Sequence, residues 1–501
     1  MKIKLFLLLA ILYSNIYAQK SKSFSSDKYI IQFDASNSKL VKVEAQITLE
    51  DSLLYMSANG PVPKRWSKYV DNLVVFDSKG KKVNVEYRDS TNWIVKSIDK
   101  GNKIRLQYNV LIEHENENWP GGIDGVAFVR DWGVMASGRS LFVMNGDKTN
   151  IKVEFKKPKD WKVSTPWKKN DNEVETYNVT NLLQLQESLL FAGTHQEIDI
   201  TRDTFNLKFV LGGDLIVKNK DEYVKRAGAI LDYYIKIMGG VPRPEPGNDL
   251  SKVVVIINQS NQIDGEVIGN HISLFLNPKA DMQGQVIGWF LFAHEFFHLW
   301  NGKTLRFNDT KADWFKEGIS NYYTLKALNN AGFIGEQETK MVLNNLFYSR
   351  YINDSGYKKL APVNAASGFD KDNHWGLVYG GGLFAGICMD MEIRHDSENS
   401  KSLTSLMRYF YEEFGGSEKT ITNNDILKQV NRFANNDLTE FMNSYIKGIK
   451  TVPLSHFMKY AGIRVDTTSN QLRLTHMEKK TELQKMLWAG FLGKEVVKSE
   501  K

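Results

Sequence analysis

The sequence has one cysteine, Cys388, among 501 residues. A single cysteine excludes any disulfide within the chain and cannot by itself form a thiolate metal site. The net charge is only +7, and the basic residues are scattered without a dense Lys/Arg block. This pattern argues against a nucleic-acid partner or a polybasic membrane surface. Beyond the N-terminus, no apolar run is long enough to cross a bilayer, so we expect no transmembrane segment in the mature chain.

The N-terminal stretch "MKIKLFLLLAILYSNIYAQKSKS" has the organisation of a signal peptide. Lys2 and Lys4 precede a short apolar core, residues 5–13, and the stretch Ile16-Tyr17-Ala18 is a plausible cleavage site before Gln19. We therefore interpret residues 1–18 as a signal peptide. The mature protein is expected to be exported, either periplasmic or secreted.

The remaining chain is too long for one ordinary core, and its 42% hydrophobic content is typical of a folded protein. Residues 24–202 contain short β-branched segments separated by turns such as "SKGK" and "DKGN", which predict an all-β, sandwich-like domain. Residues 203–395 mix helical and strand patterns, with "SKVVVIINQS" and "GNHISLFLN" interpreted as two strands. Residues 396–462 are helical, and residues 463–501 form a short C-terminal tail. The predicted fold class is α+β, with several domains.

The segment "FLFAHEFFHLWNG" places two of the nine histidines four residues apart. In a helix, His294 and His298 would project from one face and could bind the same metal ion. Glu295 lies between them, where it could reach a metal-bound water without being a ligand. This is the H-E-x-x-H pattern, in which the glutamate is the general base of a zinc peptidase.

A third ligand is expected in the helix of "KADWFKEGISNYYTLKALNNAG". Glu317 follows His298 with eighteen residues between them. Two histidines and a glutamate are one of the standard ligand sets of catalytic zinc, with a fourth position open for water. We therefore expect one zinc ion per chain. Asn321, one turn after Glu317, is a candidate to hydrogen-bond a ligand histidine.

These motifs resemble those of the gluzincin metallopeptidases, in particular the glycyl aminopeptidase family. "AHEFFHLWNGKTLRF" is similar to the family's H-E-x-x-H-x-W-N, and "WFKEGISNYYT" to its W-x-x-E-G. The resemblance continues over roughly residues 28–465. It implies a thermolysin-like catalytic domain between a β domain and a helical region. Family members commonly end in a PDZ domain, for which the residues after Ala461 are too few.

The same resemblance suggests roles for four further residues. Tyr379, in "LVYGGG", matches the tyrosine that hydrogen-bonds the oxyanion. Family members carry a glutamate, on a strand before the zinc helix, that holds the free amino group of the substrate. In the matching segment "IGNHISLF" that position is Asn270, followed by His271. Glu266, four residues earlier, is the alternative.

The sequence therefore predicts an exported zinc metallopeptidase that acts on peptides or proteins. The resemblance favours an aminopeptidase for small N-terminal residues such as Gly or Ala. A zinc endopeptidase or oligopeptidase with the same chemistry, and a catalytically silent peptide-binding protein, remain alternatives. The oligomeric state does not follow from the sequence.

Overall fold

The computed structural model describes residues 27–58, 66–89, 91–119, 123, 125–246, 249–368 and 370–494. The predicted signal peptide lies outside these residues. Among them, no helix combines the length and the apolar character that crossing a membrane would require.

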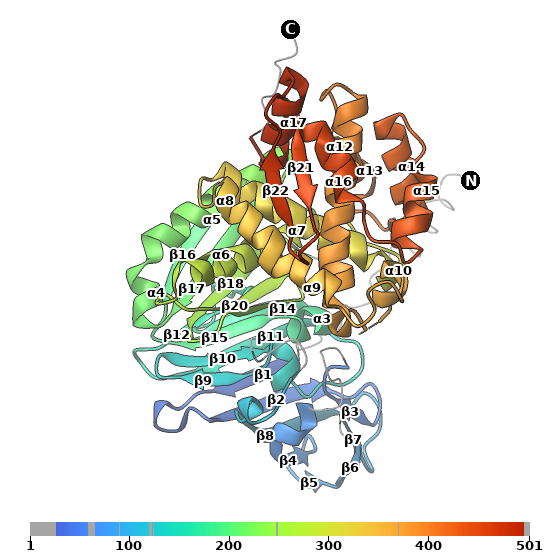
Figure 1. Ribbon diagram of the computed structural model, residues 1–501. Helices are drawn as coiled ribbons and strands as arrows, with labels where there is room; N and C mark the ends of the chain where they lie inside the picture. The colour runs from blue at the N-terminus through green and yellow to red at the C-terminus, as the bar shows by residue number, and fades with distance from the viewer. Residues whose placement is uncertain are drawn as a thin grey trace, which may run out of the picture.

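The N-terminal domain consists of β-sheets, as the sequence predicts (Figure 1). Buried and more exposed side chains alternate along its long strands, so one face of the largest sheet covers an apolar core. That eight-stranded sheet has the order β13-β14-β11-β1-β2-β8-β4-β5. Its strands are β1 (Lys28–Gln32), β2 (Leu40–Thr48), β4 (Val70–Phe76), β5 (Lys82–Val83), β8 (Lys103–Leu111), β11 (Thr149–Lys156), β13 (Lys168–Lys169) and β14 (Thr176–Asn181).

Two smaller sheets and several short helices complete this domain. The three-stranded sheet contains β3 (Leu53–Tyr55), β7 (Asn92–Val95) and β6 (Val85–Asp89). The four-stranded sheet contains β12 (Lys162–Ser164), β15 (Leu189–Gly193), β10 (Gly133–Ser137) and β9 (Phe128–Arg130). The helices are η1 (Ala35–Asn37), η2 (Trp66–Tyr69), η3 (His114–Asn116), α2 (Gly138–Leu141) and α3 (Leu182–Gln186).

The catalytic domain is built on a five-stranded sheet with the order β16-β17-β18-β20-β19. Its interior strand β18 is buried along almost its whole length, as expected for a strand covered on both faces. β16 pairs antiparallel with β17, so this sheet begins at Gln196 and the predicted boundary at residue 202 falls inside a hairpin. The strands are β16 (Gln196–Arg202), β17 (Phe205–Gly212), β18 (Lys252–Gln259), β19 (Asp264–Ile268) and β20 (His271–Leu276).

β19 is a strand that the sequence analysis did not predict. It pairs antiparallel with β20 and forms the edge of the sheet, next to the helix that carries the two histidines. Its short, polar sequence "DGEVI" lacks the apolar alternation by which strands were identified. An exposed edge strand can pair with an extended peptide, and β19 lies beside the helix of the two histidines.

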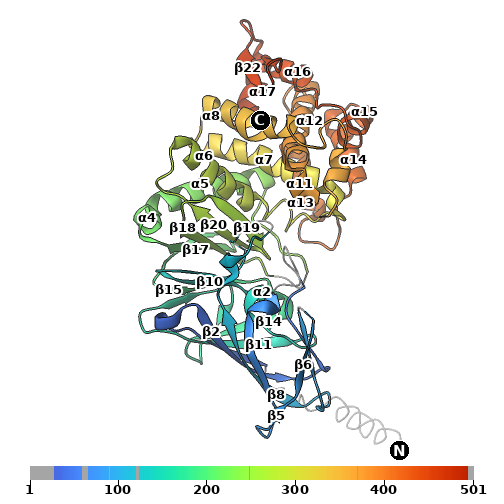
Figure 2. The same ribbon diagram turned by 60° about the horizontal axis from the view of Figure 1, so that its bottom comes forward.

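The four-stranded sheet of the N-terminal domain lies against the catalytic sheet (Figure 2). A separate apolar core fills this interface, with Phe128 and Phe191 from one domain and Val254 and Phe275 from the other. The rings of Phe128 and Phe275 are 5.0 Å apart between centroids. This apolar, closely packed contact joins the two domains.

Helices cover the other face of the catalytic sheet (Figure 1). Phe292 and Phe296 of α6 pack on Phe209 of β17, and the Tyr234 hydroxyl donates to the Ala293 carbonyl oxygen at 2.9 Å. These contacts bury α6 between the sheet and its helical neighbours. The helices of this layer are α4 (Asp214–Lys218), α5 (Lys220–Met238), α6 (Met282–Phe297), η4 (Thr310–Ala312) and α7 (Asp313–Asn330).

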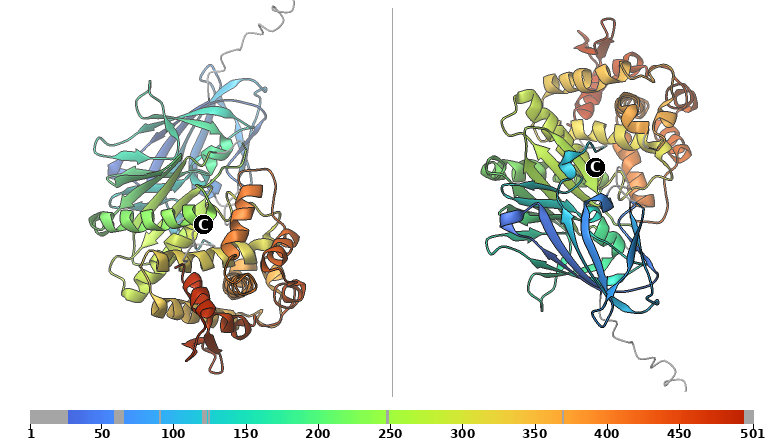
Figure 3. Two further views of the ribbon diagram at one scale, coloured as in Figure 1. Left: turned by 90° about the horizontal axis from the view of Figure 1, so that it is seen from above. Right: turned by 90° about the horizontal axis from the view of Figure 1, so that it is seen from below.

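The chain after α7 is mainly helical, and its C-terminal tail belongs to the same core as the catalytic domain. Trp488 and Phe491 of the tail pack into this core, so the tail is not a separate unit. The N-terminal strands and the C-terminal helices lie at opposite ends of the molecule (Figure 3). The elements are α8 (Glu336–Met341), η5 (Val342–Tyr348), α9 (Ser349–Ile352), α10 (Pro362–Ala365), α11 (Asp370–Asn373), η6 (Gly376–Gly381), α12 (Gly382–Asp396), α13 (Leu403–Phe414), α14 (Asn423–Ala434), α15 (Thr439–Phe441), η7 (Met442–Ile446), α16 (Leu454–Phe457), η8 (Met458–Ala461), β21 (Ile463–Asp466), β22 (Arg473–His476) and α17 (Glu482–Phe491).

Two glycines let α7 and α12 approach each other closely. A Cβ atom at Gly318 would lie 2.1 Å from the carbonyl carbon of Gly382, and one at Gly382 would lie 2.0 Å from the Trp314 carbonyl oxygen. Both distances are far shorter than a van der Waals contact, so neither position can hold a side chain without moving a helix.

We therefore predict that Gly318→Ala destabilises the fold by about 1–3 kcal/mol or more, because the methyl group must push two backbones apart. Gly228→Ala in α5 is the matched control, since its Cβ would lie 3.5 Å from the nearest atom, a guanidinium nitrogen of Arg202. Thermal unfolding of both variants tests the prediction. Equal stability of the two would show that the α7–α12 contact is not as tight as described.

Candidate metal centre

Three side chains from α6 and α7 meet at one point. The Nε2 atoms of His294 and His298 are 3.0 Å apart, and Oε2 of Glu317 lies 3.4 Å from the first and 3.1 Å from the second. His294 lies in the last turn of α6 and His298 is its C-cap, so the helix presents both rings on one face. Glu317 comes from the buried face of α7.

The donor set fits a tetrahedral zinc ion. Ligand atoms about 2.0–2.1 Å from a tetrahedral centre are about 3.3 Å from one another, close to the three separations found here. Two imidazoles facing each other through Nε2, with a carboxylate beside them, form a zinc-type ligand set. The chain thus supplies three ligands, and a catalytic zinc site of this type keeps its fourth position for water or substrate.

Backbone contacts orient His298. Its Nδ1 lies 3.0 Å from the carbonyl oxygen of Asn301, so that nitrogen carries the proton and Nε2 is left as a lone-pair donor. The Asn301 side chain in turn donates to the carbonyl oxygen of Lys316 at 2.8 Å, which connects the end of α6 to α7. The loop after the second histidine is therefore part of the support of the site.

Lysine side chains compensate the charge of Glu317. Burial alone would raise the pKa of this carboxyl, but Lys371, together with His298 and Lys316, holds it well below the ordinary value. The Lys371 ammonium donates to Oε1 of Glu317 at 3.1 Å and also lies 3.3 Å from Asp313. Glu317 is therefore kept ionised, as a metal ligand must be.

Glu295 has a different environment. Its side chain is 8% exposed, and burial raises its pKa, against the opposing effect of His294 and His298. A carboxylate with a raised pKa is a stronger base than an ordinary one. Glu295 is thus suited to accept a proton, whereas Glu317 is suited to remain charged.

Tyr379 lies over the same site, in the π-helical segment η6. Its ring is 6.2 Å from the ring of His294 and stacks on Trp375 with centroids 5.0 Å apart. Burial raises the pKa of its phenol well above the ordinary value, so it remains a hydrogen-bond donor. Asn321, predicted to contact a ligand histidine, instead donates to the Tyr379 carbonyl oxygen at 3.2 Å. It connects α7 to η6.

These residues line a cleft of about 860 Å³, which we call the metal cleft. Glu266 of β19 also lines it, close enough to Glu295 for the two charges to interact. Its Oε2 atom is buried and has no hydrogen-bond partner within the part of the chain that the structure describes. Burial raises the pKa of Glu266 to about 7, partly offset by the Arg139 guanidinium. A buried carboxylate without a partner is a candidate for binding a ligand cation.

Asn270 and His271, the first candidates for contact with the substrate's amino group, lie elsewhere. They line a second cavity rather than the metal cleft. Nδ1 of His271 accepts a hydrogen bond from the Val254 amide at 3.2 Å, and burial lowers the pKa of this histidine to about 3. Asn270 lies in the turn before β20, and His271 is the first residue of β20. The strand at the edge of the sheet is β19.

Sequence reasoning missed Lys371 and Trp375, which contact Glu317 and Tyr379. Both belong to a polar segment, "DKDNHWG", that reads as an ordinary surface loop. Arg139 and Glu266 were also not placed in one cleft, because they come from different domains and no spacing in the sequence connects them. Only the fold brings these residues together.

Two family models match the chain, and both describe the same family. The model described as "Peptidase M61 N-terminal domain" matches residues 28–194, and the model described as "M61 glycyl aminopeptidase" matches residues 289–378. Together they cover just over half of the chain. The chain belongs to the M61 peptidase family. The second match includes His294, Glu295, His298 and Glu317 of this M61 peptidase and ends one residue before Tyr379.

Solved structures share the fold of this M61 peptidase at low sequence identity. An aminopeptidase N family protein from Idiomarina loihiensis is 17% identical, with a TM-score of 0.75, and the match covers 88% of this chain and 79% of that one. An M1 zinc metallopeptidase from Deinococcus radiodurans is 13% identical, with a TM-score of 0.52 and coverage of 86% and 95%. A mutant of it, also 13% identical, with a TM-score of 0.52 and coverage of 86% and 94%, was solved with a Tyr-Ser-Ala substrate. No curated protein sequence matches the chain.

We predict that the purified protein holds one equivalent of zinc and that His298→Ala abolishes this binding, because the ion loses one of its three ligands. His374→Ala is the matched control, since His374 hydrogen-bonds Asp354 outside the cluster. Elemental analysis by mass spectrometry measures the zinc content. Removal of zinc with a chelator should also lower the unfolding temperature, because a ligand at 1,000 times its Kd stabilises by about 4 kcal/mol. Unchanged zinc in His298→Ala would exclude this ligand set.

Proposed function

We propose that this M61 peptidase is a zinc-dependent aminopeptidase. The observation that carries the exopeptidase part is the unpartnered carboxylate of Glu266 in the metal cleft. A peptide's N-terminal ammonium would supply hydrogen-bond donors and a second positive charge beside that of Arg139. Glu266 thus takes the role that the sequence analysis first gave to Asn270.

His294, His298 and Glu317 would hold the zinc ion. When bound, zinc polarises the substrate's carbonyl group and lowers the pKa of a water molecule. Glu295 accepts the proton of the attacking water as the water oxygen bonds to the carbonyl carbon. Glu295 then gives this proton to the nitrogen of the leaving amine as the carbon–nitrogen bond breaks. The residue therefore ends the cycle in the charge state in which it began.

Tyr379 would stabilise the charge that develops on the carbonyl oxygen. Its phenol remains protonated because burial raises its pKa, and stacking on Trp375 fixes its ring. A donor held in place before the reaction begins loses little free energy to reorganisation. Asn321 acts through the tyrosine backbone and is a positioning residue.

The first substrates that we propose are short peptides with Gly or Ala at the N-terminus. This choice rests on the family, whose matched model is described as a glycyl aminopeptidase. That a structural neighbour was solved with a tripeptide substrate supports peptides as the substrate class.

We also propose that the protein is exported, to the periplasm or beyond. The support is the basic and apolar N-terminal stretch that precedes Gln19. N-terminal sequencing of the protein from the cell envelope, expected to begin at Gln19, tests this proposal. An N-terminus at Met1 on a cytoplasmic protein would contradict it.

We predict that Glu295→Gln retains zinc but lowers kcat by at least about 100-fold, because the amide cannot accept the water's proton. Glu392→Gln is the matched control, because Glu392 is also buried but hydrogen-bonds Asn436 in the helical region. Initial rates on an Ala-containing tripeptide measure the effect. A zinc-loaded Glu295→Gln protein with near wild-type turnover would remove Glu295 from the mechanism.

We further predict that Glu266→Gln lowers kcat/KM on free peptides by about 10- to 100-fold, the value of a hydrogen bond to a charged group. Asn270→Ala should leave kcat/KM unchanged, because Asn270 lies outside the metal cleft. Mass spectrometry of free and N-acetylated peptides is the assay. Internal cleavage of both peptide forms would favour the endopeptidase alternative. The absence of cleavage by zinc-loaded protein would favour the silent binding protein.

A further inference from the structure

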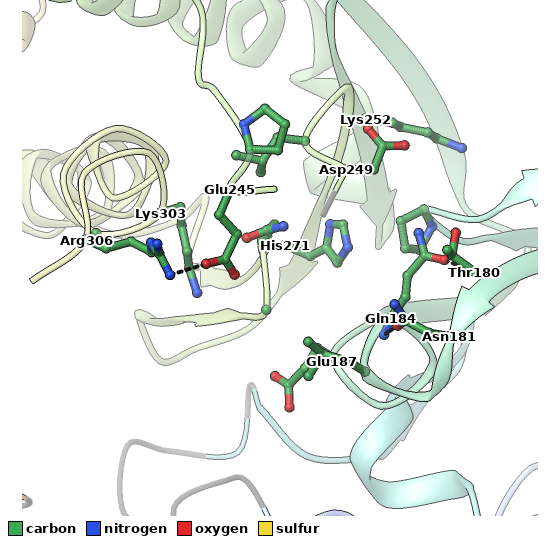
Figure 4. A pocket seen from close by; sticks show the side chains of 17 residues that line it. Thr180, Asn181, Gln184, Glu187, Glu245, Asp249, Lys252, His271, Lys303 and Arg306 are labelled. Carbon is green, nitrogen blue, oxygen red and sulfur yellow. Dashed lines mark hydrogen bonds and ion pairs between the residues drawn. The ribbon is translucent and has the colours of Figure 1, made fainter. Parts of the chain in front are cut away.

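A second cavity lies next to the metal cleft, between the N-terminal and catalytic domains. It has a volume of about 390 Å³, and we call it the side cavity. In Figure 4, Gln184 and Glu187 lie on one side of it, and Lys303 and Arg306 lie across from them. Its lining is polar, with charges of both signs. A cavity of this kind can hold a short stretch of peptide with its main-chain polar groups hydrogen-bonded.

Of the residues that the structure describes, only Gly302 and Lys303 line both the side cavity and the metal cleft. Between the cavities stands an ion pair of the N-terminal domain. Arg139 lines the metal cleft and Glu187 lines the side cavity. The Arg139 Nε atom donates to Oε1 of Glu187 at 3.1 Å, and its Nη2 atom contacts Oε2. The two cavities are thus separated by side chains.

The pair is held firmly in this position. The side chains of Arg139 and Glu187 are only 12% and 14% exposed, and a bidentate contact fixes their relative orientation. The main chain of Glu187 also packs on the turn between β19 and β20. A Cβ atom at Gly269 in that turn would lie 2.2 Å from the Glu187 carbonyl oxygen. The pair is therefore anchored at the end of the edge strand.

This position matters for a peptide bound along β19. Glu266 lies on β19, three residues before Gly269 of the turn, and the Arg139 guanidinium is near enough to affect the pKa of Glu266. If the N-terminal ammonium binds Glu266, as in the proposed function on which this inference rests, the amino end lies in the cleft that Arg139 also lines, and Glu187 contacts the turn that follows the strand. A residue or blocking group preceding that end would meet the pair.

We propose that the Arg139–Glu187 pair determines exopeptidase specificity by closing the metal cleft beyond the substrate's amino end. The side cavity is the space that a blocked or longer amino end would enter if the pair were removed. The pair does not touch the reacting atoms; it sets which peptides can bind. Its removal converts an enzyme for free N-termini into one that also accepts N-acetylated peptides and cuts internal bonds.

The test uses the full mature chain with zinc and compares free with N-acetylated peptides of the same sequence. The double variant Arg139→Ala/Glu187→Ala should raise the ratio of kcat/KM for acetylated to free peptide by at least about tenfold, since the block is steric. Arg202→Ala/Asp232→Ala is the matched control, because it removes another bidentate pair that lies outside both cavities. Its ratio should equal that of the wild type.

Two further variants keep the test decisive. Glu187→Gln retains the size of the side chain, so it should fold even if the double variant does not. Because a neutral amide holds the Arg139 guanidinium less firmly than a carboxylate does, the barrier becomes easier to displace, and the ratio should rise in the same direction by a smaller factor. Leu183→Trp, added to the double variant, should return the ratio of kcat/KM for acetylated to free peptide to the wild-type value. The larger side chain would fill the side cavity, because Leu183 lines it and is 46% exposed.

The outcomes separate this inference from the proposed function. Wild-type protein that cuts neither peptide form contradicts both. Wild-type protein that cuts only free peptides, together with folded variants that still refuse acetylated ones, overturns the role of the ion pair and leaves the aminopeptidase assignment intact. If the ratio stays raised after Leu183→Trp is added to the double variant, the side cavity is not the space that the blocked amino end enters.

Discussion

The backbone contact between α7 and α12 is the constraint on which the site depends. At Gly318 and Gly382 the two helices meet without side chains between them. Glu317 directly precedes the first of these glycines, and Tyr379 lies in the π-helical segment that leads into the second. The contact therefore sets the distance between a metal ligand and the phenol that would face the substrate. Two side chains from separate helices can keep such a geometry only if the helices cannot move apart.

Around this fixed geometry, the local charges assign different roles to two buried glutamates. Glu317 is surrounded by the ammonium groups of Lys371 and Lys316, which keep its pKa low. The pKa of Glu295 is raised by burial, and no lysine forms an ion pair with it within the described residues. Carboxylates whose environments push their pKa values apart can serve as ligand and base in the same cleft. The separation of roles is thus a property of the environment of each glutamate.

The sequence predicted those parts of the structure that depend on local spacing. The β character of the N-terminal domain, the mixed catalytic domain and the family resemblance all followed from patterns within single segments. The H-E-x-x-H segment and Glu317 could be identified because each lies on a helix with a regular period. Asn270 illustrates where this reasoning fails. Which of two short strands forms the edge of a sheet is decided by tertiary pairing, and β19 has no apolar alternation to reveal it.

The residues that would control access to the cleft were beyond sequence reasoning for a further physical reason. Arg139 and Glu187 belong to the β domain, whereas Glu266 belongs to the catalytic sheet, and the domain interface with its apolar core around Phe128 and Phe275 brings them together. Because the main chain of Glu187 packs on Gly269, the ion pair is held next to the end of β19. The specificity of the cleft is consequently shared between the two domains. The N-terminal domain would then be part of the active site, because it would supply the side chains that select free amino ends.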